Sequence, residues 1–418
     1  VEMPTVNNGT GVFIRRIATG AGNISTATVT LTLTNPIAGS YNFKAFGIEM
    51  VKALNENFDI GDGTSTGTFS SINITSENAV ATGGTGSVAT LPAAYPKGWN
   101  AFYCMKYEIT QEQYVNFLNT LTYDQQATRT AIAPNSVALN WAMGSSVAIT
   151  GRSRNGIKIQ TSGVASTTPA VYGCDLGGAA VSRAPDNAFN GTYDGQNIPC
   201  NYLSWADLAA YLDWACLRPM TDLEYEKICR GPIARIAGEF AWGNTVITWG
   251  KAGSSWNNHN IKSVSEVACN GGATVITGNG LCAYSGGTCD VDNNTLGNGY
   301  TATDGPLRVG FAATASTNRI TAGAAYYGAL DMSGNIYERV VAVDATGVLF
   351  TGALGDGSLD GTTGEANVAN WPGTTAAGSG FRGGNWYDVS SYLRTSDRTF
   401  ATTTSTSRTC TYGGRGVR

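Results

Sequence analysis

Helical periodicity is confined to a short part of this chain, and this limits what the chain can fold into. A helix cap followed by an apolar stripe occurs in three places: Thr110 before QEQYVNFLNTL, Ser204 before WADLAAYLDWAC and Thr221 before DLEYEKICR. Gln113 lies three residues after Thr110, and Glu224 lies three residues after Thr221, which is the pattern of a capping box. We therefore predict three helices, the last of which stops at Gly231.

The rest of the chain indicates short strands and long loops. Residues 232–418 are rich in Gly, Thr, Asn and aromatic residues and have little helical periodicity. Near the N-terminus, TATVTLTLT (26–34) alternates apolar residues with threonine, as a half-buried strand does. The predicted fold class is α+β with few helices, short strands and long loops. We divide the chain into an N-terminal β segment (1–45), which adds extra strands, and a domain over 46–418.

Composition excludes some classes of function and favours others. Charged residues make up 13% of the chain, about half the usual share, so Thr, Ser, Asn and Gly must supply the polar surface. This suits an extracellular or structural protein. Lys and Arg total 26 without a basic run, which argues against nucleic-acid binding. No apolar run approaches the roughly 20 residues of a membrane span. Because the sequence starts at Val1 without a signal-like segment, a mature secreted chain at the cell surface is expected.

Cysteine and histidine usage does not favour a catalytic or zinc site. The chain has nine cysteines, no CxxC motif and one histidine, His259. Cys282 and Cys289 flank a Gly-Gly turn and are the best candidates for a local disulfide. GTSTG (63–67) matches the GxSxG nucleophile-elbow motif of hydrolases, but it lies in a polar loop and is far from His259 in the sequence. DVDNN (290–294) begins like a calcium loop, yet Thr295 and Thr301 replace the expected Gly and Glu, so a turn is favoured.

Several motifs resemble, in order, those of one known family. They are MVKALNENFDIGDG (50–63), YCMKYEITQEQYVNFLN (103–119), NYLSWADLAAYLDW (201–214), LRPMTDLEYEKICRG (217–231), GEFAWGN (238–244), GALDMSGNIYERV (328–340), FRGGNWYDVSSYLR (381–394) and the terminal GGRGVR. Together they resemble the formylglycine-generating enzyme or sulfatase-modifying-factor family over roughly residues 46–418. The resemblance implies a variant of the C-type-lectin fold.

The resemblance does not extend to the residues that carry the family's chemistry. Formylglycine-generating enzymes place two copper-binding cysteines after the RGG motif, and Tyr387 and Leu393 stand at the corresponding positions here. A soft Cu(I) ion needs thiolate ligands, which neither residue supplies. The iron-dependent sulfoxide synthases of the family use three histidines, and this chain has one. The chain is therefore expected not to be an enzyme, and a divergent oxidoreductase is kept as the weakest alternative.

The resemblance also implies a structural calcium ion at the DMSGN motif. Family members bind Ca²⁺ there through carboxylates and main-chain carbonyls. The matching positions here are Asp331, Gly334, Ile336 and Glu338. Two carboxylates and two carbonyls on a tight turn suit a hard cation, although Asp331 and Glu338 would also be explained as residues that only cap turns.

The stretch after RGG has the composition of a binding surface. In the variable proteins of diversity-generating retroelements, which share a similar framework, this segment binds ligands. A mixture of tyrosine and small polar residues is typical of binding paratopes, because tyrosine gives contact area at low entropic cost. The candidate ligand-binding residues are Tyr387, Asp388, Ser390, Ser391, Tyr392, Thr395 and Asp397.

These observations support three hypotheses about function. The first is a secreted, non-enzymatic cell-surface protein that acts as a structural or adhesive component. Such a protein could self-assemble into a filament or layer through its N-terminal strand or a sheet edge, since unpaired edges invite pairing. The second is a display protein that binds a glycan or protein ligand on its C-terminal face. The third is the divergent oxidoreductase.

Overall fold

The computed structural model describes residues 44–144, 153–177, 185–191, 194–251, 267–268, 279–284 and 305–418. This part of the chain contains four α-helices and thirteen strands of two to five residues. The predicted α+β class, with few helices and short strands, is confirmed. All but the last two residues of the β segment predicted at 1–45 lie outside the described ranges, and so does His259.

The predicted helix starts are confirmed, and one helix was missed. The helices are α1 (Gln111–Leu118), α2 (Tyr123–Arg129), α3 (Trp205–Trp214) and α4 (Asp222–Arg230). Each begins with a full capping box, in which the cap hydroxyl accepts from the third backbone amide and that residue's side chain accepts from the cap amide. None of the helices in the described residues is long and apolar enough to cross a membrane.

The main sheet joins segments from both ends of the described chain. Its strand order is β1 (Met50–Ala53), β4 (Phe102–Met105), β13 (Gly416–Val417) and β7 (Arg218–Pro219). All of its pairings are antiparallel. The C-terminal strand thus lies inside the sheet, with β1 and β7 at the two edges.

Smaller sheets surround the main one. Two antiparallel pairs are formed by β2 (Phe58–Ile60) with β3 (Ile72–Ile74) and by β5 (Ile157–Thr161) with β6 (Val171–Cys174). A third is β11 (Glu338–Val341) with β12 (Ser379–Arg382). A three-stranded sheet contains β8 (Thr248–Lys251), β9 (Val267–Ala268) and β10 (Leu281–Cys282). Short 3₁₀ turns occur at Gly347–Leu349 and Ser390–Leu393.

Three apolar clusters form most of the core, and each buries one tryptophan. Trp386 packs with residues of α1, α3, β5 and β6, Trp242 with residues of α4 and the main sheet, and Trp205 with residues of β2 and β3. All three side chains are almost completely buried. Large aromatic side chains thus stabilise a chain that has little regular structure.

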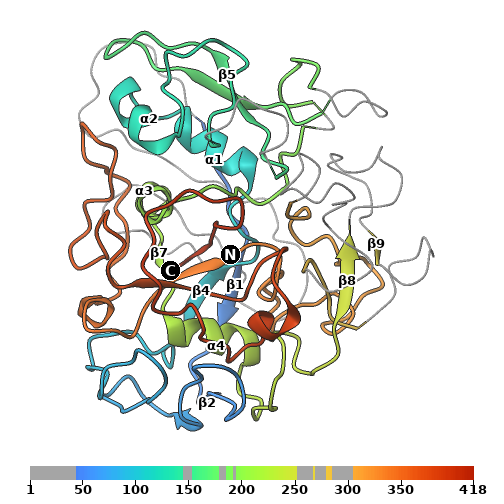
Figure 1. Ribbon diagram of the computed structural model, residues 1–418. Helices are drawn as coiled ribbons and strands as arrows, with labels where there is room; N and C mark the ends of the chain where they lie inside the picture. The colour runs from blue at the N-terminus through green and yellow to red at the C-terminus, as the bar shows by residue number, and fades with distance from the viewer. Residues whose placement is uncertain are drawn as a thin grey trace.

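Helices α1 and α2 lie toward one end of the main sheet's strands, and α4 lies toward the other end (Figure 1). Figure 1 shows α1, α2 and β5 grouped beyond one end of strands β1 and β4, while α4 and β2 lie at the other end. The β11–β12 pair contacts α4. The chain leaves β12 through the RGG motif, so this packing places the motif beside α4.

Candidate functional site

The glycine pair after Arg382 allows a close approach between two motifs. Gly383 and Gly384 have φ angles of +83° and +67°, which residues with a side chain rarely adopt. A Cβ atom on Gly383 would lie 2.6 Å from the carbonyl oxygen of Met332, in the DMSGN motif. The Gly334 amide also donates to the Gly383 carbonyl over 2.8 Å. The two motifs therefore pack directly on each other.

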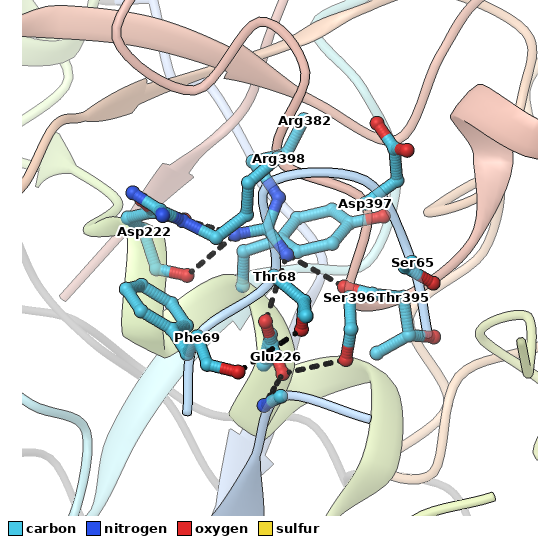
Figure 2. A network of polar contacts seen from close by, with 12 residues as sticks. Ser65, Thr68, Phe69, Asp222, Glu226, Arg382, Thr395, Ser396, Asp397 and Arg398 are labelled. Carbon is cyan, nitrogen blue, oxygen red and sulfur yellow. Dashed lines mark hydrogen bonds and ion pairs between the residues drawn. The ribbon is translucent and has the colours of Figure 1, made fainter. Parts of the chain in front are cut away.

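The arginines of the RGG segment form a buried ion-pair network with α4 (Figure 2). Arg382 donates to Asp222 and, over 3.0 Å, to Glu226, while Arg398 lies 3.0 Å from Asp222. The side chains of these four residues are completely buried. Arg398 also stacks on the Phe69 ring at 4.0 Å from its centroid. We call this group the arginine network, and it holds the segment after β12 against α4.

The network extends along α4 to a further ion pair. Arg230 lies 3.0 Å from Glu226 and also contacts Glu239. Glu226 accepts two more hydrogen bonds, of 2.8 Å from the Gly61 amide and 3.0 Å from the Ser396 hydroxyl. The charges of the carboxylates and guanidinium groups therefore offset one another inside the protein, which is how buried charges are stabilised.

The predicted ligand-binding residues do not all lie on one exposed face. Tyr387 is 46% exposed. Asp388, Ser390, Ser391 and Tyr392 are half-buried. The remaining two, Thr395 and Asp397, are buried, with 1% and 5% exposure.

The two buried residues support the backbone instead. The Thr395 carbonyl accepts from Arg382 over 2.6 Å, and the Asp397 carboxylate accepts from the Thr399 amide over 3.1 Å. Figure 2 shows the Asp397 carboxylate directed away from the ion pairs. Because Thr395 and Asp397 belong to the packed framework, the predicted ligand-binding residues that remain open to a ligand all lie within residues 387–392. We call these six residues the exposed face.

Asp388 is the acidic residue of the exposed face. Its carboxylate accepts from the Asn385 side-chain amide over 2.6 Å and from the Tyr337 hydroxyl. Burial raises the pKa of Asp388 to about 6, against the opposing effect of the Tyr337 hydrogen bond. The Tyr387 ring packs 5.7 Å from Trp386, and Tyr392 packs 5.3 Å from Phe400. The exposed face is thus held by aromatic residues beneath it.

The positions matched to the family's redox cysteines differ in accessibility. Tyr387 is exposed, whereas Leu393 is completely buried. All seven cysteines in the described part of the chain are buried. Burial raises the pKa of Cys104 and of Cys229 to about 12, and it also raises the pKa of Cys200, Cys282 and Cys410. Such thiols lack the thiolate character that redox chemistry needs.

Of the two cysteines predicted to form a disulfide, Cys282 and Cys289, the structure describes only Cys282, and the state of Cys282 does not support the bond. Cys282 is a free thiol at the end of β10. Cys289 lies outside the described residues, as does the DVDNN segment (290–294).

The DMSGN motif carries carboxylates in a buried polar cluster. Asp331, with a φ angle of +60°, accepts from the Gly310 amide over 2.6 Å. One Glu338 oxygen accepts from Arg415 over 2.5 Å, and the other is buried without a hydrogen-bond partner. The Ile336 amide donates to Glu108 over 3.2 Å. Sequence reasoning missed Glu108, which comes from the loop before α1.

The charges of this cluster fit a cation. Burial raises the pKa of Glu108, and the Asp331 carboxylate raises it further. Burial also raises the pKa of Glu338, and Arg415 only partly offsets this. Three buried carboxylates therefore face one arginine, and one carboxylate oxygen has no donor. Asp331 and Glu338, with the carbonyls of Gly334 and Ile336, would hold the Ca²⁺ ion that the family resemblance implies, and its chemistry there would be structural.

A second acidic group was not predicted from the sequence. Asp175, Asp186 and Asp194 each offer a carboxylate oxygen, and these three oxygens lie within 4.8 Å of one another. Among the described residues, this is the one group of three acidic, histidine or cysteine side chains whose ligand atoms lie close enough together to share a metal ion. The residues are 11 and 8 positions apart in loops, so no sequence motif signals them.

Comparisons with known proteins identify one family and a small set of similar structures. Residues 79–418 match the model of the sulfatase-modifying factor enzyme 1-like domain. PvdO from Pseudomonas aeruginosa is 14% identical, with a TM-score of 0.37, and the match covers 88% of this chain and 93% of PvdO. Treponema denticola variable protein 1 is 12% identical, with a TM-score of 0.33, covering 92% and 99% of the two chains. CarF is 14% identical, with a TM-score of 0.33, covering 89% and 98%. No curated protein matches the chain.

Proposed function

Since the chain belongs to the family of sulfatase-modifying factor enzyme 1-like domains, we propose that it is a secreted, non-enzymatic cell-surface protein that acts as an adhesive component. In this proposal the family fold is a rigid scaffold, and the exposed face (387–392) makes the contact. The proposal rests on which residues of the segment after β12 are buried and which are exposed. Arg382 and Arg398 are completely buried in ion pairs, whereas Tyr387 and Val389 of the exposed face reach the surface.

The absence of accessible thiol chemistry in the described residues supports the non-enzymatic part of the proposal. A cysteine acts as a nucleophile or copper ligand only as a thiolate. The seven described cysteines are buried, and the pKa is raised in most of them. The charged side chains of the arginine network are equally inaccessible, so they stabilise the fold and do not contact a substrate.

The composition of the exposed face supports recognition. Tyr387 is 46% exposed and packs on the buried Trp386 ring, so its orientation is partly fixed before any ligand binds. A pre-oriented aromatic loses little conformational entropy on binding, while neighbouring Ser390 and Ser391 offer adaptable hydroxyl groups. This arrangement fits a glycan or a peptide, both of which combine apolar faces with hydrogen-bonding groups.

A binding experiment tests the proposal directly. The purified chain would be applied to glycan and peptide arrays, and the best ligand would then be measured by calorimetry. Tyr387→Ala should weaken binding by about 30-fold or more if Tyr387 is a central contact. Tyr326→Ala is the matched control, since Tyr326 is a similarly exposed tyrosine (37%) outside the exposed face. Equal binding by the two variants, or no binding on either array, would contradict the proposal. Turnover of a thiol substrate by metal-loaded protein would support the divergent oxidoreductase instead.

A second candidate function, self-assembly, is favoured by the edge of the main sheet. Among the described residues, β1 pairs with β4 on one side, and its other side forms the sheet edge. Such an edge can accept a strand from another copy. Negative-stain imaging and sedimentation of concentrated protein would test this, and monodisperse monomers would count against it.

A further inference from the structure

Three aspartates from distant loop positions meet at the end of a hairpin. Asp175 directly follows β6 of the β5–β6 pair. Asp186 and Asp194 come from the loops that follow, and one oxygen of each carboxylate lies within 4.8 Å of the others. Asp175 and Asp194 are 0% and 1% exposed, whereas Asp186 is exposed. Like charges this close repel one another strongly where water is excluded.

A buried oxygen without a partner points to a missing ligand at this position. The Asp175 Oδ2 atom accepts from Lys158 over 2.7 Å, while its Oδ1 atom is buried and has no hydrogen-bond partner. An unpaired oxygen on a buried carboxylate costs free energy unless a donor or a cation satisfies it. Oδ1 is therefore an oxygen of this aspartate group that is free to bind a cation.

The neighbouring side chain of Gln196 also has a buried oxygen that accepts no hydrogen bond. Gln196 donates to the Gly191 carbonyl over 2.6 Å, and the Gly191 amide donates to Asp194 over 2.6 Å. Gln196 is 2% exposed, and its side-chain oxygen has no hydrogen-bond partner. Two buried oxygens without donors therefore occur at or beside the aspartate group.

The net charge of the group also requires a cation. Lys158 supplies one ammonium charge against three carboxylates. A divalent ion would neutralise the two excess charges.

We propose that Asp175, Asp186 and Asp194 bind a calcium ion that ties the loops at 185–191 and 194–196 to the end of β6. The group offers oxygen atoms only, which suits calcium and disfavours zinc. The exposed Asp186 leaves one side of the ion open to water, which calcium accepts readily. This site lies in a different segment from the DMSGN motif, and it does not depend on the proposed adhesive function.

Terbium luminescence can test the proposal on the full chain. Terbium occupies calcium sites and is sensitised by a nearby tryptophan. Lys158 lies 4.5 Å from the centroid of the Trp141 ring and 2.7 Å from Asp175, so Trp141 is one side chain away from the site. We expect sensitised emission that calcium displaces. Trp141→Phe should lower that emission and leave the calcium stoichiometry, measured by equilibrium dialysis, unchanged.

The matched variants remove one ligand without changing side-chain shape. Asp186→Asn should weaken calcium binding by about 10-fold or more. At limiting calcium, it should also lower the number of calcium ions bound per chain by one. Because Asp186 is exposed, this variant should fold normally. Asp194→Asn, at a buried ligand, should act in the same direction. Asp124→Asn is the control, because Asp124 is an acidic residue of α2 outside the group, and it should bind calcium like the unmodified chain.

Several results would overturn the proposal. Asp186→Asn and Asp194→Asn proteins that are folded by circular dichroism and retain full calcium affinity would exclude the site. So would calcium binding that disappears in Glu338→Gln but persists unchanged in both aspartate variants. Binding of manganese or zinc with no binding of calcium would show that the assigned ion is wrong.

Discussion

At the residue scale, Asp222 joins the two arginines of the RGG segment in the arginine network. Its carboxylate serves both Arg382 and Arg398, and all three side chains are completely buried. Asp222→Asn would leave two guanidinium groups without their shared counter-charge. We expect the free energy of unfolding to fall by about 3–5 kcal/mol, measured by urea denaturation.

An exposed ion pair provides the comparison for that prediction. Glu49 lies 2.6 Å from Lys106, and the two side chains are 59% and 28% exposed. Glu49→Gln should cost less than about 1 kcal/mol, because water screens the charges. If the two substitutions had equal effects, burial would not be what makes the arginine network important.

Asp388 gives a prediction for pH dependence. Its pKa in the folded protein is about 6, which is above the ordinary value of 3.8. The folded state therefore binds the proton more tightly than the unfolded state, so the contribution of Asp388 to stability is largest below pH 4 and is lost as pH rises through 6. The loss amounts to at most about 3 kcal/mol. Asp388→Asn should flatten this part of the pH profile of the melting temperature, and an unchanged slope would show that other groups cause it.

At the element scale, helix caps explain why the sequence predicts the helices well. Thr110, Ser204 and Thr221 cap α1, α3 and α4, and capping depends on residues that are close in sequence. Helix α2 has an equally complete capping box at Thr122 and Gln125. It was missed because the sequence that follows, YDQQATR, has no apolar stripe.

The same caps allow a prediction for two helices. Thr221 is buried, accepts from the Glu224 amide over 3.2 Å and donates to the Pro96 carbonyl over 3.0 Å. Thr221→Ala should lower the free energy of unfolding by about 1–2 kcal/mol. Thr122 makes only the exposed capping bonds of α2, so Thr122→Ala should cost about 0.5 kcal/mol. Chemical denaturation of both variants would show which of them loses more stability. A larger loss for Thr122→Ala than for Thr221→Ala would contradict the prediction.

The candidate site is less predictable because its contacts are distant in sequence. Arg382 and Asp222 are 160 residues apart, and Arg398 and Asp222 are 176 apart. The RGG motif indicated a framework, but no local pattern could show that its arginines pair with α4. The same long range led us to expect Thr395 and Asp397 at the surface, whereas both are buried. The three aspartates beside β6 were missed because the fold, and no motif, brings them together.

At the scale of the whole molecule, thiol protection measures how completely the core excludes water. Seven of the nine cysteines are buried, and the other two, Cys269 and Cys289, lie outside the described residues. Alkylation with iodoacetamide followed by mass spectrometry should modify at most these two in the native protein. The seven buried cysteines should react once urea unfolds the chain. Rapid native labelling of Cys104 or Cys229 would show that the core opens, and it would weaken the case against thiol chemistry.

The position of β13 inside the main sheet has a consequence for synthesis on the ribosome. Residues 416–417 lie between β4 and β7, and the Arg418 amide donates to the Tyr103 carbonyl over 2.7 Å. A growing polypeptide that has not yet reached Gly416 leaves the facing sides of β4 and β7 without their partner. The central sheet can therefore close only after translation of these residues, and until then the nascent chain presents two open strand edges to chaperones.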